Sequence, residues 1–392
     1  MACHWGTKPG RANYSKPRNP KLASFRFELA RPEDDMQLRD LLARNVMSGE
    51  ISLSFRREPA YFAACQLDGN ESQTIVCREL TSDRIVGLGS RSVRERYVDG
   101  QVERIGYLST LRLDQEHRRH GLVARGFRFF KGLHEDIKAS FQAKYYVTTI
   151  ADGNGAAEQT LLGGRAGLPL YHRIGTWSTY SLSMRRCRSG PISGVEVRPV
   201  HESELGLVVG YLNAIGATRN LFPKYRIEDF NPRSGTFRGL KRSNLFVAWE
   251  KGDIVGTFAL WDQSAFKQVV VEGYASWLRC CRPLYNAWAY CERDPKLPKP
   301  GEVLEHSVGS LLVVRNDSSD VANLLVSKAC DAYSKTPSRL LLGFDARCPL
   351  STSFASRASH VYTTGVYLVS WDPMQWKEYN RDRLIYLELG CL

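Results

Sequence analysis

The sequence predicts a mixed α/β protein made of two tandem halves, each a mostly antiparallel central sheet flanked by helices. Its 392 residues exceed the size of one ordinary small domain. Segments of alternating apolar and polar residues, which are typical of strands, are interleaved with apolar stripes at helical spacing. The order of these segments restarts after the basic stretch 185–191, whose Gly and Pro are typical of a linker.

The first half opens with the alternating strand Phe25–Leu29. Pro32 and the three acidic residues after it suit the first turn of a helix. Asp99-Gly100 tolerates the positive φ of a hairpin turn and separates two strands. The β-branched and aromatic run Tyr145–Ile150 is typical of a buried central strand. The remaining expected elements are helices at 61–67, 121–137 and 154–162, and strands at 74–80, 84–91, 102–113, 170–174 and 177–184.

The second half repeats this order but carries an insertion, 266–301, between its third and fourth strands. Apolar and aromatic residues recur at helical spacing from Phe266 to Cys281. Such a stripe predicts packing on the first half, on a second protomer or over an acceptor. The expected elements are strands at 195–200, 245–250, 254–261, 304–315, 339–345 and 365–371, and helices at 202–215 and 319–333. The chain thus divides into a tail (1–24), a first half (25–185), a linker (186–194) and a second half (195–392).

Charge and cysteine content narrow the class of protein. The formal net charge of +13 favours anionic partners without naming one. The first 24 residues hold five Lys or Arg, three Pro and no acid, which predicts a disordered tail. Ten cysteines without C-x-x-C or zinc-ligand spacing indicate free thiols in a reducing compartment, and hence a cytoplasmic protein without a metal. Because no run of about 18 apolar residues occurs, we expect no membrane partner.

The sharpest local signal is a basic, Gly-containing loop between the strand 102–113 and the helix that starts at Gly121. The free backbone N–H groups and the dipole at a helix start bind phosphate without a special side chain. Gly121 lets the backbone approach the anion closely, and Arg118 and Arg119 supply positive charge. The pattern therefore predicts a phosphate or pyrophosphate site at this loop.

This stretch resembles the pyrophosphate-binding motif of the GNAT N-acyltransferases, in which Arg or Gln is followed three residues later by Gly. Arg118 and Gly121 match that spacing, and Leu113 fills the apolar position at the strand end. Val123 departs from the family pattern, which has Gly or Ala there. Asn154 begins a match to the Asn-x-x-Ala opening of the next family motif. The resemblance covers the first half and implies a GNAT fold with acetyl-CoA or another acyl-CoA as co-substrate.

The resemblance also implies where the co-substrate binds. Backbone N–H groups around Leu111 would polarise the thioester carbonyl as an oxyanion hole. The family's contacts to CoA come from the end of the strand, the loop and the start of the helix. The corresponding residues here are Leu111, Leu113, Arg118, Arg119, His120, Gly121, Leu122, Val123, Ala124 and Asn154.

Catalysis in this family is direct attack of an amine on the thioester, so a group must take the amine's proton. Members that modify histones place a glutamate eleven residues before the motif's arginine, and that position is Tyr107 here. Glu103 lies earlier on the same strand face and could act through water, or be an exposed hairpin carboxylate. The family's tyrosine that protonates the leaving thiolate corresponds to Leu161. Tyr171 is a candidate substitute, with a packed strand tyrosine as its alternative.

The sequence thus favours an acyl-CoA-dependent N-acyltransferase, in the simplest case an N-acetyltransferase, acting on an amine acceptor. The second half has Asp317 and Asp320 where pyrophosphate would lie, so we expect it to shape the acceptor site or a homodimer rather than bind CoA. One alternative is an inactive acyl-CoA sensor, which the departure at Val123 favours. The other is a nucleic-acid-associated protein. Only the positive net charge favours it, because no nucleic-acid-binding pattern is present.

Overall fold

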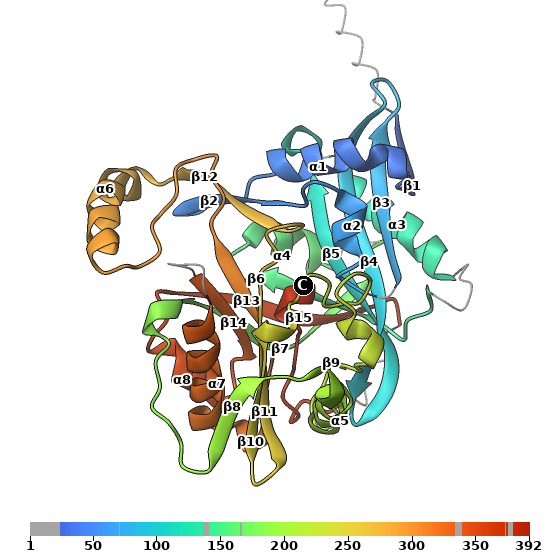
Figure 1. Cartoon of the computed structure of the whole chain (residues 1–392). Helices are drawn as coiled ribbons and strands as arrows, with labels where there is room; N and C mark the ends of the chain where they lie inside the picture. The colour runs from blue at the N-terminus through green and yellow to red at the C-terminus, as the bar shows by residue number, and fades with distance from the viewer. Residues whose placement is uncertain are drawn as a thin grey trace, which may run out of the picture.

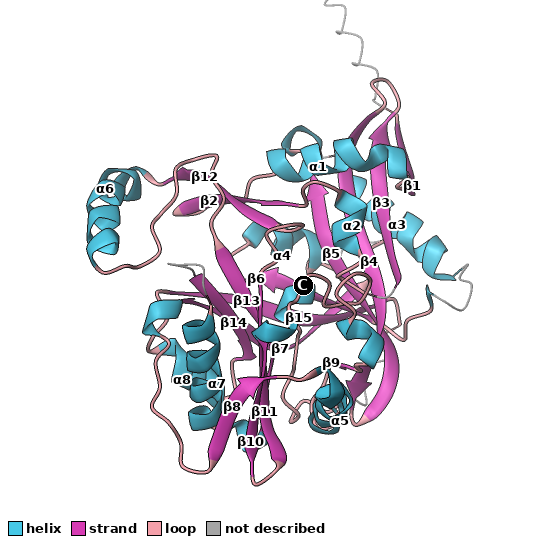
Figure 2. Ribbon diagram, viewed as in Figure 1, coloured by secondary structure: helices cyan, strands magenta, loops and turns pink. Residues whose placement is uncertain are grey.

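One large sheet, to which both halves contribute, dominates the computed structural model (Figures 1 and 2). The expected tail 1–24 lies outside the described residues except for Ser24. No helix in the described part of the chain is long and apolar enough to cross a membrane. The structure describes residues 24–69, 71–118, 120–135, 141–164, 167–333, 339–372, 374 and 379–392.

The first half follows the expected order of elements closely. One strand, β2, was not expected, and the two strands expected at 170–174 and 177–184 form a single strand, β7. Its strands are β1 (Phe25–Leu29), β2 (Ile51–Arg56), β3 (Glu71–Glu79), β4 (Arg84–Val98), β5 (Gln101–Leu113), β6 (Tyr146–Ala151) and β7 (Leu170–Ser183). Its helices are α1 (Asp35–Arg44), α2 (Tyr61–Cys65), α3 (Leu122–Glu135) and α4 (Gly155–Leu161).

The second half also follows the expected order, with two additional short elements, β9 and α8, and two that replace the expected helical insertion. Its strands are β8 (Val195–Pro199), β9 (Phe222–Pro223), β10 (Leu245–Glu250), β11 (Asp253–Trp261), β12 (Gln268–Tyr274), β13 (His306–Val314), β14 (Arg339–Asp345) and β15 (His360–Ser370). Its helices are α5 (Leu205–Gly216), α6 (Ser276–Cys291), α7 (Ser319–Ala332) and α8 (Pro349–Ala355).

The expectation of one helix from Phe266 to Cys281 is wrong. Residues Gln268–Tyr274 form β12, which pairs antiparallel with β2 of the first half, and the helix α6 begins only at Ser276. The misleading residues Phe266, Val270 and Tyr274 are four apart, a spacing that fits both a strand face and a helix face. The β2–β12 pair therefore fastens the start of the insertion to the first half.

The two halves exchange their last strands. Along the sheet the order is β1-β3-β4-β5-β6-β15-β7-β14-β13-β11-β10-β8. The last strand of the second half, β15, lies between β6 and β7, and β7 in turn pairs with β14. Each half thus completes the sheet of the other. The boundaries 25–185 and 195–392 remain predictions about the sequence repeat, because the sheet itself is shared.

Helices cover both faces of the first-half sheet. Leu38, Leu41 and Leu42 of α1 pack with Val76 of β3, whereas Leu122 of α3 packs with the next residue of that strand, Cys77. Because neighbouring strand residues point to opposite faces, α1 and α3 lie on opposite sides of the sheet. This arrangement places the loop before α3 at the end of β5, on the α3 side.

Candidate functional site

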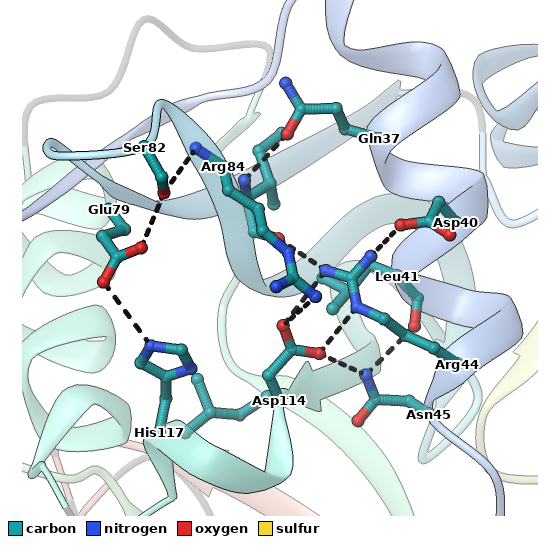
Figure 3. Close-up of polar contacts among 12 residues, drawn as sticks. Gln37, Asp40, Leu41, Arg44, Asn45, Glu79, Ser82, Arg84, Asp114 and His117 are labelled. Carbon is teal, nitrogen blue, oxygen red and sulfur yellow. Dashed lines mark hydrogen bonds and ion pairs between the residues drawn. The ribbon is translucent and has the colours of Figure 1, made fainter.

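The loop before α3 is anchored at its first residue, Asp114 (Figure 3). The buried Asp114 carboxylate accepts hydrogen bonds from Arg44 Nε at 2.9 Å and from Asn45 Nδ2 at 3.2 Å. Arg84 Nη2 lies 3.4 Å from the same carboxylate. Farther along the loop, His117 Nε2 lies 3.8 Å from a carboxylate oxygen of Glu79. These contacts fix the direction in which the loop leaves β5, so that α3 starts at a defined place.

The start of α3 has the geometry of an anion site. Gly121 has φ +65°, and a Cβ at this position would meet no atom within 4 Å. The exposed Gly121 and His120 precede Leu122, which is buried, and the half-buried Val123 and Ala124. Because the first N–H groups of a helix lack partners within it, those of residues 122–124 are free of intrahelical bonds. The open space around Gly121 therefore adjoins these amides.

The arginine side chains near the loop make different contacts. The exposed Arg118 donates to the carbonyl of Leu113 at 3.4 Å, which holds it beside the strand end. Arg125 of α3 donates to the carbonyl of Phe25 at 2.9 Å and stacks over Phe27. Arg119 lies outside the described residues. The nearby positive charge comes from Arg118 and Arg125 in the described part of the loop and helix.

The strand before the loop contains a strained bulge. Thr110 has φ +51°, a conformation that β-branched residues rarely adopt. The register between β4 and β5 shifts here, so that Thr110 and Leu111 together lie opposite the single residue Gly89 and neither has an in-register partner. The Thr110 hydroxyl donates at 2.8 Å to Ser90, which lies 2.9 Å from the hydroxyl of the buried Tyr61. This buried hydroxyl chain holds the bulge in place.

Beside the bulge, β5 and β6 separate. Their parallel pairing covers only Gly106–Tyr146 and Tyr107–Val147, and beyond it the strands diverge. Gly106 is needed at the start of this opening, because a Cβ there would lie 2.1 Å from the ring of Tyr146. Thr148 donates to the carbonyl of Leu108 at 2.9 Å and closes the narrow end. An opening between two strands thus lies next to the bulge and the loop.

An apolar cavity of about 90 Å³ continues from the bulge under α3. Leu111 at its edge is 41% exposed, so the cavity is reached from the surface at the bulge. Among the residues that line it are Ser109 and Leu111 of the bulge region, Leu113 at the strand end, and Leu122, Val123 and Phe130 of α3. The cavity lining thus includes the residues on either side of the loop and those beside Thr110, so the loop, the bulge and the cavity lie next to one another.

The three catalytic candidates from the sequence lie in different surroundings. Tyr107 lies where β5 and β6 part, with its hydroxyl 3.3 Å from Thr149 Oγ1, and burial raises its pKa. Near the hairpin end, Glu103 Oε1 forms an ion pair with Nζ of Lys144 at 2.9 Å. Tyr171 packs edge-on against Tyr367 of β15, and burial raises its pKa as well. Of the three, only Tyr107 is next to the strand opening.

Asn154, predicted to lie near the pantetheine arm, caps α4. Its side chain accepts a hydrogen bond from the backbone N–H of Ala157 at 3.2 Å. The Asn-x-x-Ala match thus has a local physical meaning here, because an asparagine at the N-cap satisfies a free helix amide. Its contact with a bound molecule stays a prediction.

A buried cluster of charges, which the sequence did not indicate, lies at the junction of the two halves. Asp68 Oδ2 forms an ion pair with Arg57 Nη2 at 2.6 Å, and Asp68 Oδ1 lies 3.0 Å from Nζ of Lys267. Burial alone would raise the pKa of Asp68, but the charges of Arg57 and Lys267 outweigh it and hold the pKa below its usual range. Asp68 and Lys267 are 199 positions apart in the sequence, so no local pattern could reveal this cluster.

The second half has a similar bulge, but there a side chain of the chain itself contacts the bulge amide. Leu311 has φ +55° at a register shift between β11 and β13, as Thr110 has in the first half. Its backbone N–H donates to the buried carboxylate of Glu388 at 3.2 Å, and Tyr225 donates to the same carboxylate. The bulge amide of the second half thus already donates a hydrogen bond to a side chain of the chain itself.

The start of α7 is also occupied by the chain's own side chains. Ser318 accepts from the N–H of Val321 and caps the helix. Asp317 forms an ion pair with Arg219 at 2.6 Å. A carboxylate therefore lies at the helix start where, in the first half, Gly121 leaves open space. The prediction that only the first half binds CoA stands on this difference.

No protein-family model and no curated protein sequence matches the chain, but the solved structures similar to it include N-acyltransferases. One N-myristoyltransferase from Saccharomyces cerevisiae with bound myristoyl-CoA is 11% identical, over 95% of this chain and 91% of that chain, with a TM-score of 0.54. A second structure of N-myristoyltransferase from Saccharomyces cerevisiae with bound myristoyl-CoA is 11% identical, over 91% and 81%, with a TM-score of 0.56. The chain has the GNAT fold.

A GCN5-related N-acetyltransferase from Sphaerobacter thermophilus is also similar, at 12% identity over 89% of this chain and 96% of that chain, with a TM-score of 0.49. In the GNAT fold of this chain, both halves share one sheet and exchange their last strands. The two structures with TM-scores above 0.5 confirm the expected mixed α/β class and GNAT fold.

Proposed function

We propose that this chain is an acyl-CoA-dependent N-acyltransferase whose first half binds the acyl-CoA. The observation that carries the proposal is that the loop before α3, the strained bulge and the apolar cavity lie next to one another. An acyl-CoA has the same sequence of parts, namely a pyrophosphate, a thioester and an acyl chain. The known structures with this fold that bind myristoyl-CoA support the proposal.

The residues fit this co-substrate part by part. The amides of residues 122–124 and the open space at Gly121 suit the pyrophosphate. The backbone amides at Thr110 and Leu111, which have no in-register partner in β4, suit the thioester oxygen. The cavity under α3 suits the acyl group, and its apolar lining favours a hydrocarbon chain over acetyl.

The reaction joins the acyl carbon to the acceptor nitrogen, breaks the bond to sulfur, and leaves CoA and an amide. One proton leaves the attacking amine and one reaches the departing thiolate. Tyr107 is the candidate donor to the thiolate, because it lies where β5 and β6 part and its phenol, whose pKa burial raises, is protonated at neutral pH. The amide of such a bulge can donate to an oxygen, as the second half illustrates, where Leu311 N–H donates to the buried Glu388 carboxylate at 3.2 Å.

The test is CoA release from acyl-CoAs of increasing chain length with a panel of primary amines. We expect thiol release that needs both substrates, and a lower kcat for Tyr107→Phe with little change in KM. Val123→Phe should shift the preference to shorter chains, because Val123 lines the cavity. Val102→Phe is the matched control, because Val102 is exposed and far along the strand.

Two results would contradict the proposal in different ways. Tight acyl-CoA binding without turnover on any amine would favour an acyl-CoA sensor. An absence of binding to any acyl-CoA would reject the assignment of the site itself. Salt-dependent binding to random DNA, in the absence of acyl-CoA binding, would favour the nucleic-acid alternative.

A further inference from the structure

The helix α6 projects from the body of the molecule (Figure 1), and large apolar side chains on one side of it are exposed. Trp277, Cys281, Leu284, Trp288 and Cys291 follow each other at intervals of four, three, four and three residues, so they lie on one side of the helix. Trp277 is 56% exposed, Leu284 is 76% exposed and Trp288 is 46% exposed. The sequence stripe was expected to be covered, and in the single chain this face is not.

The opposite face of α6 is covered by the chain that follows it. Asn286 and Leu297 exchange two hydrogen bonds, at 2.9 and 2.8 Å. The hydroxyl of Tyr285 donates to the carbonyl of Pro295 at 3.3 Å, and Ala289 is fully buried. The helix is thus supported from behind, and its outward face is a built feature of the fold.

The surroundings of this face are positively charged. Residues 276–299 contain five basic and two acidic side chains. One of the acids, Asp294, is buried and paired with Arg186. The guanidinium of Arg186 also lies 5.5 Å from the ring of Trp288, and Nζ of Lys296 lies 4.8 Å from the ring of Tyr290. Tryptophan, tyrosine and basic side chains therefore occur side by side.

Two occupants compete for such a face. A second copy of the chain would bring two basic segments together. A helix of 16 residues is also only about 24 Å long, which is short for a surface that must supply the roughly 800 Å² per partner of a stable interface. A membrane surface has neither problem, because anionic lipid headgroups complement the basic rim. Tryptophan and tyrosine are the side chains that prefer the boundary between headgroups and acyl chains.

We infer that α6 lies flat on an anionic membrane surface, with Trp277, Leu284 and Trp288 inserted at the headgroup boundary. The sequence predicted no membrane partner because it lacks a run long enough to span a bilayer, but an interfacial helix needs no such run. The inference rests on exposure and charge at α6 and is independent of acyl transfer.

Vesicle co-sedimentation of the full chain tests this inference. We expect binding to vesicles of phosphatidylcholine with phosphatidylserine, and weak binding to phosphatidylcholine alone or at high salt. The triple variant Trp277→Ser, Leu284→Ser, Trp288→Ser should bind on the order of 100-fold more weakly. A triple variant at Met36, Leu207 and Ile227, each to Ser, is the matched control, because these large side chains are also exposed but lie outside α6.

Thiol labelling gives a second readout. Cys280, Cys281 and Cys291 are the exposed cysteines of the described chain, and all three lie on α6. In a Cys3→Ser background, anionic vesicles should slow their reaction with a water-soluble thiol reagent. Unchanged labelling and no vesicle binding would overturn the inference, as would equal binding by the α6 triple variant. A dimer of the wild type that the same variant converts to a monomer, without vesicle binding, would assign the face to a second copy instead.

Discussion

Replacing Gly121 by aspartate tests the anion-binding role of the loop before α3. At φ +65° a residue with a side chain pays about 1–2 kcal/mol of backbone strain, but no atom within 4 Å obstructs the new Cβ. The variant should therefore fold. Its carboxylate would face the open space in front of the α3 amides, where the pyrophosphate of CoA is proposed to lie.

The expected loss of affinity follows from Coulomb's law. At about 4 Å in a water-like dielectric, each phosphate charge costs about 1 kcal/mol against the new carboxylate. Two such charges give about 2 kcal/mol, which corresponds to roughly 30-fold weaker CoA binding. Isothermal titration with CoA at low ionic strength measures this change, because salt screens an exposed charge pair.

Gly252→Asp is the matched control for Gly121→Asp. Gly252 also has a positive φ, +89°, and open space around its Cβ, but it lies in the β10–β11 turn of the second half. It should lose similar stability and keep the affinity of the wild type for CoA. A Kd of Gly121→Asp within about threefold of the wild type would refute the assigned site, and so would an equal loss in both variants.

Three further outcomes follow from the packing. Gly106→Ala should lower the free energy of unfolding in urea by about 1–3 kcal/mol, because the new Cβ would lie 2.1 Å from the ring of Tyr146. Gly132→Ala is the control and should not lower it, because Gly132 lies on α3 with open space around its Cβ. Asp68→Asn should cost about 3–5 kcal/mol at pH 7 by unpairing buried charges. Since the pKa of Asp68 is held low, its contribution is present above the unfolded value of about 4 and is lost as pH falls further, so wild type and variant should converge in acid melts. Residues 25–185 expressed alone should give poorly dispersed NMR spectra, because β15 is then missing between β6 and β7; a well-dispersed monomer would contradict this.

Local pattern was enough for most elements and for the position of the loop. The alternation at Phe25–Leu29 and the turn at Asp99-Gly100 each depend on residues a few positions apart, and both occur where expected. The anion loop depends on the strand end and on Gly121, which are also neighbours in sequence. Such features are set by backbone preference and side-chain period, which a sequence displays directly.

The sequence by itself determined the mixed α/β class, the repeated order of elements and the strand–loop–helix junction at Arg118–Gly121. Only the tertiary structure decided that β7 and β15 change places, that Asp68 meets Lys267, and that the bulge amide of Leu311 is taken by Glu388. These pairs are far apart in sequence, and their contacts are selected by burial and charge compensation across the whole sheet. Helical spacing failed at Phe266–Tyr274 for the same reason, because the pairing of β12 with the distant β2 overrides the local period.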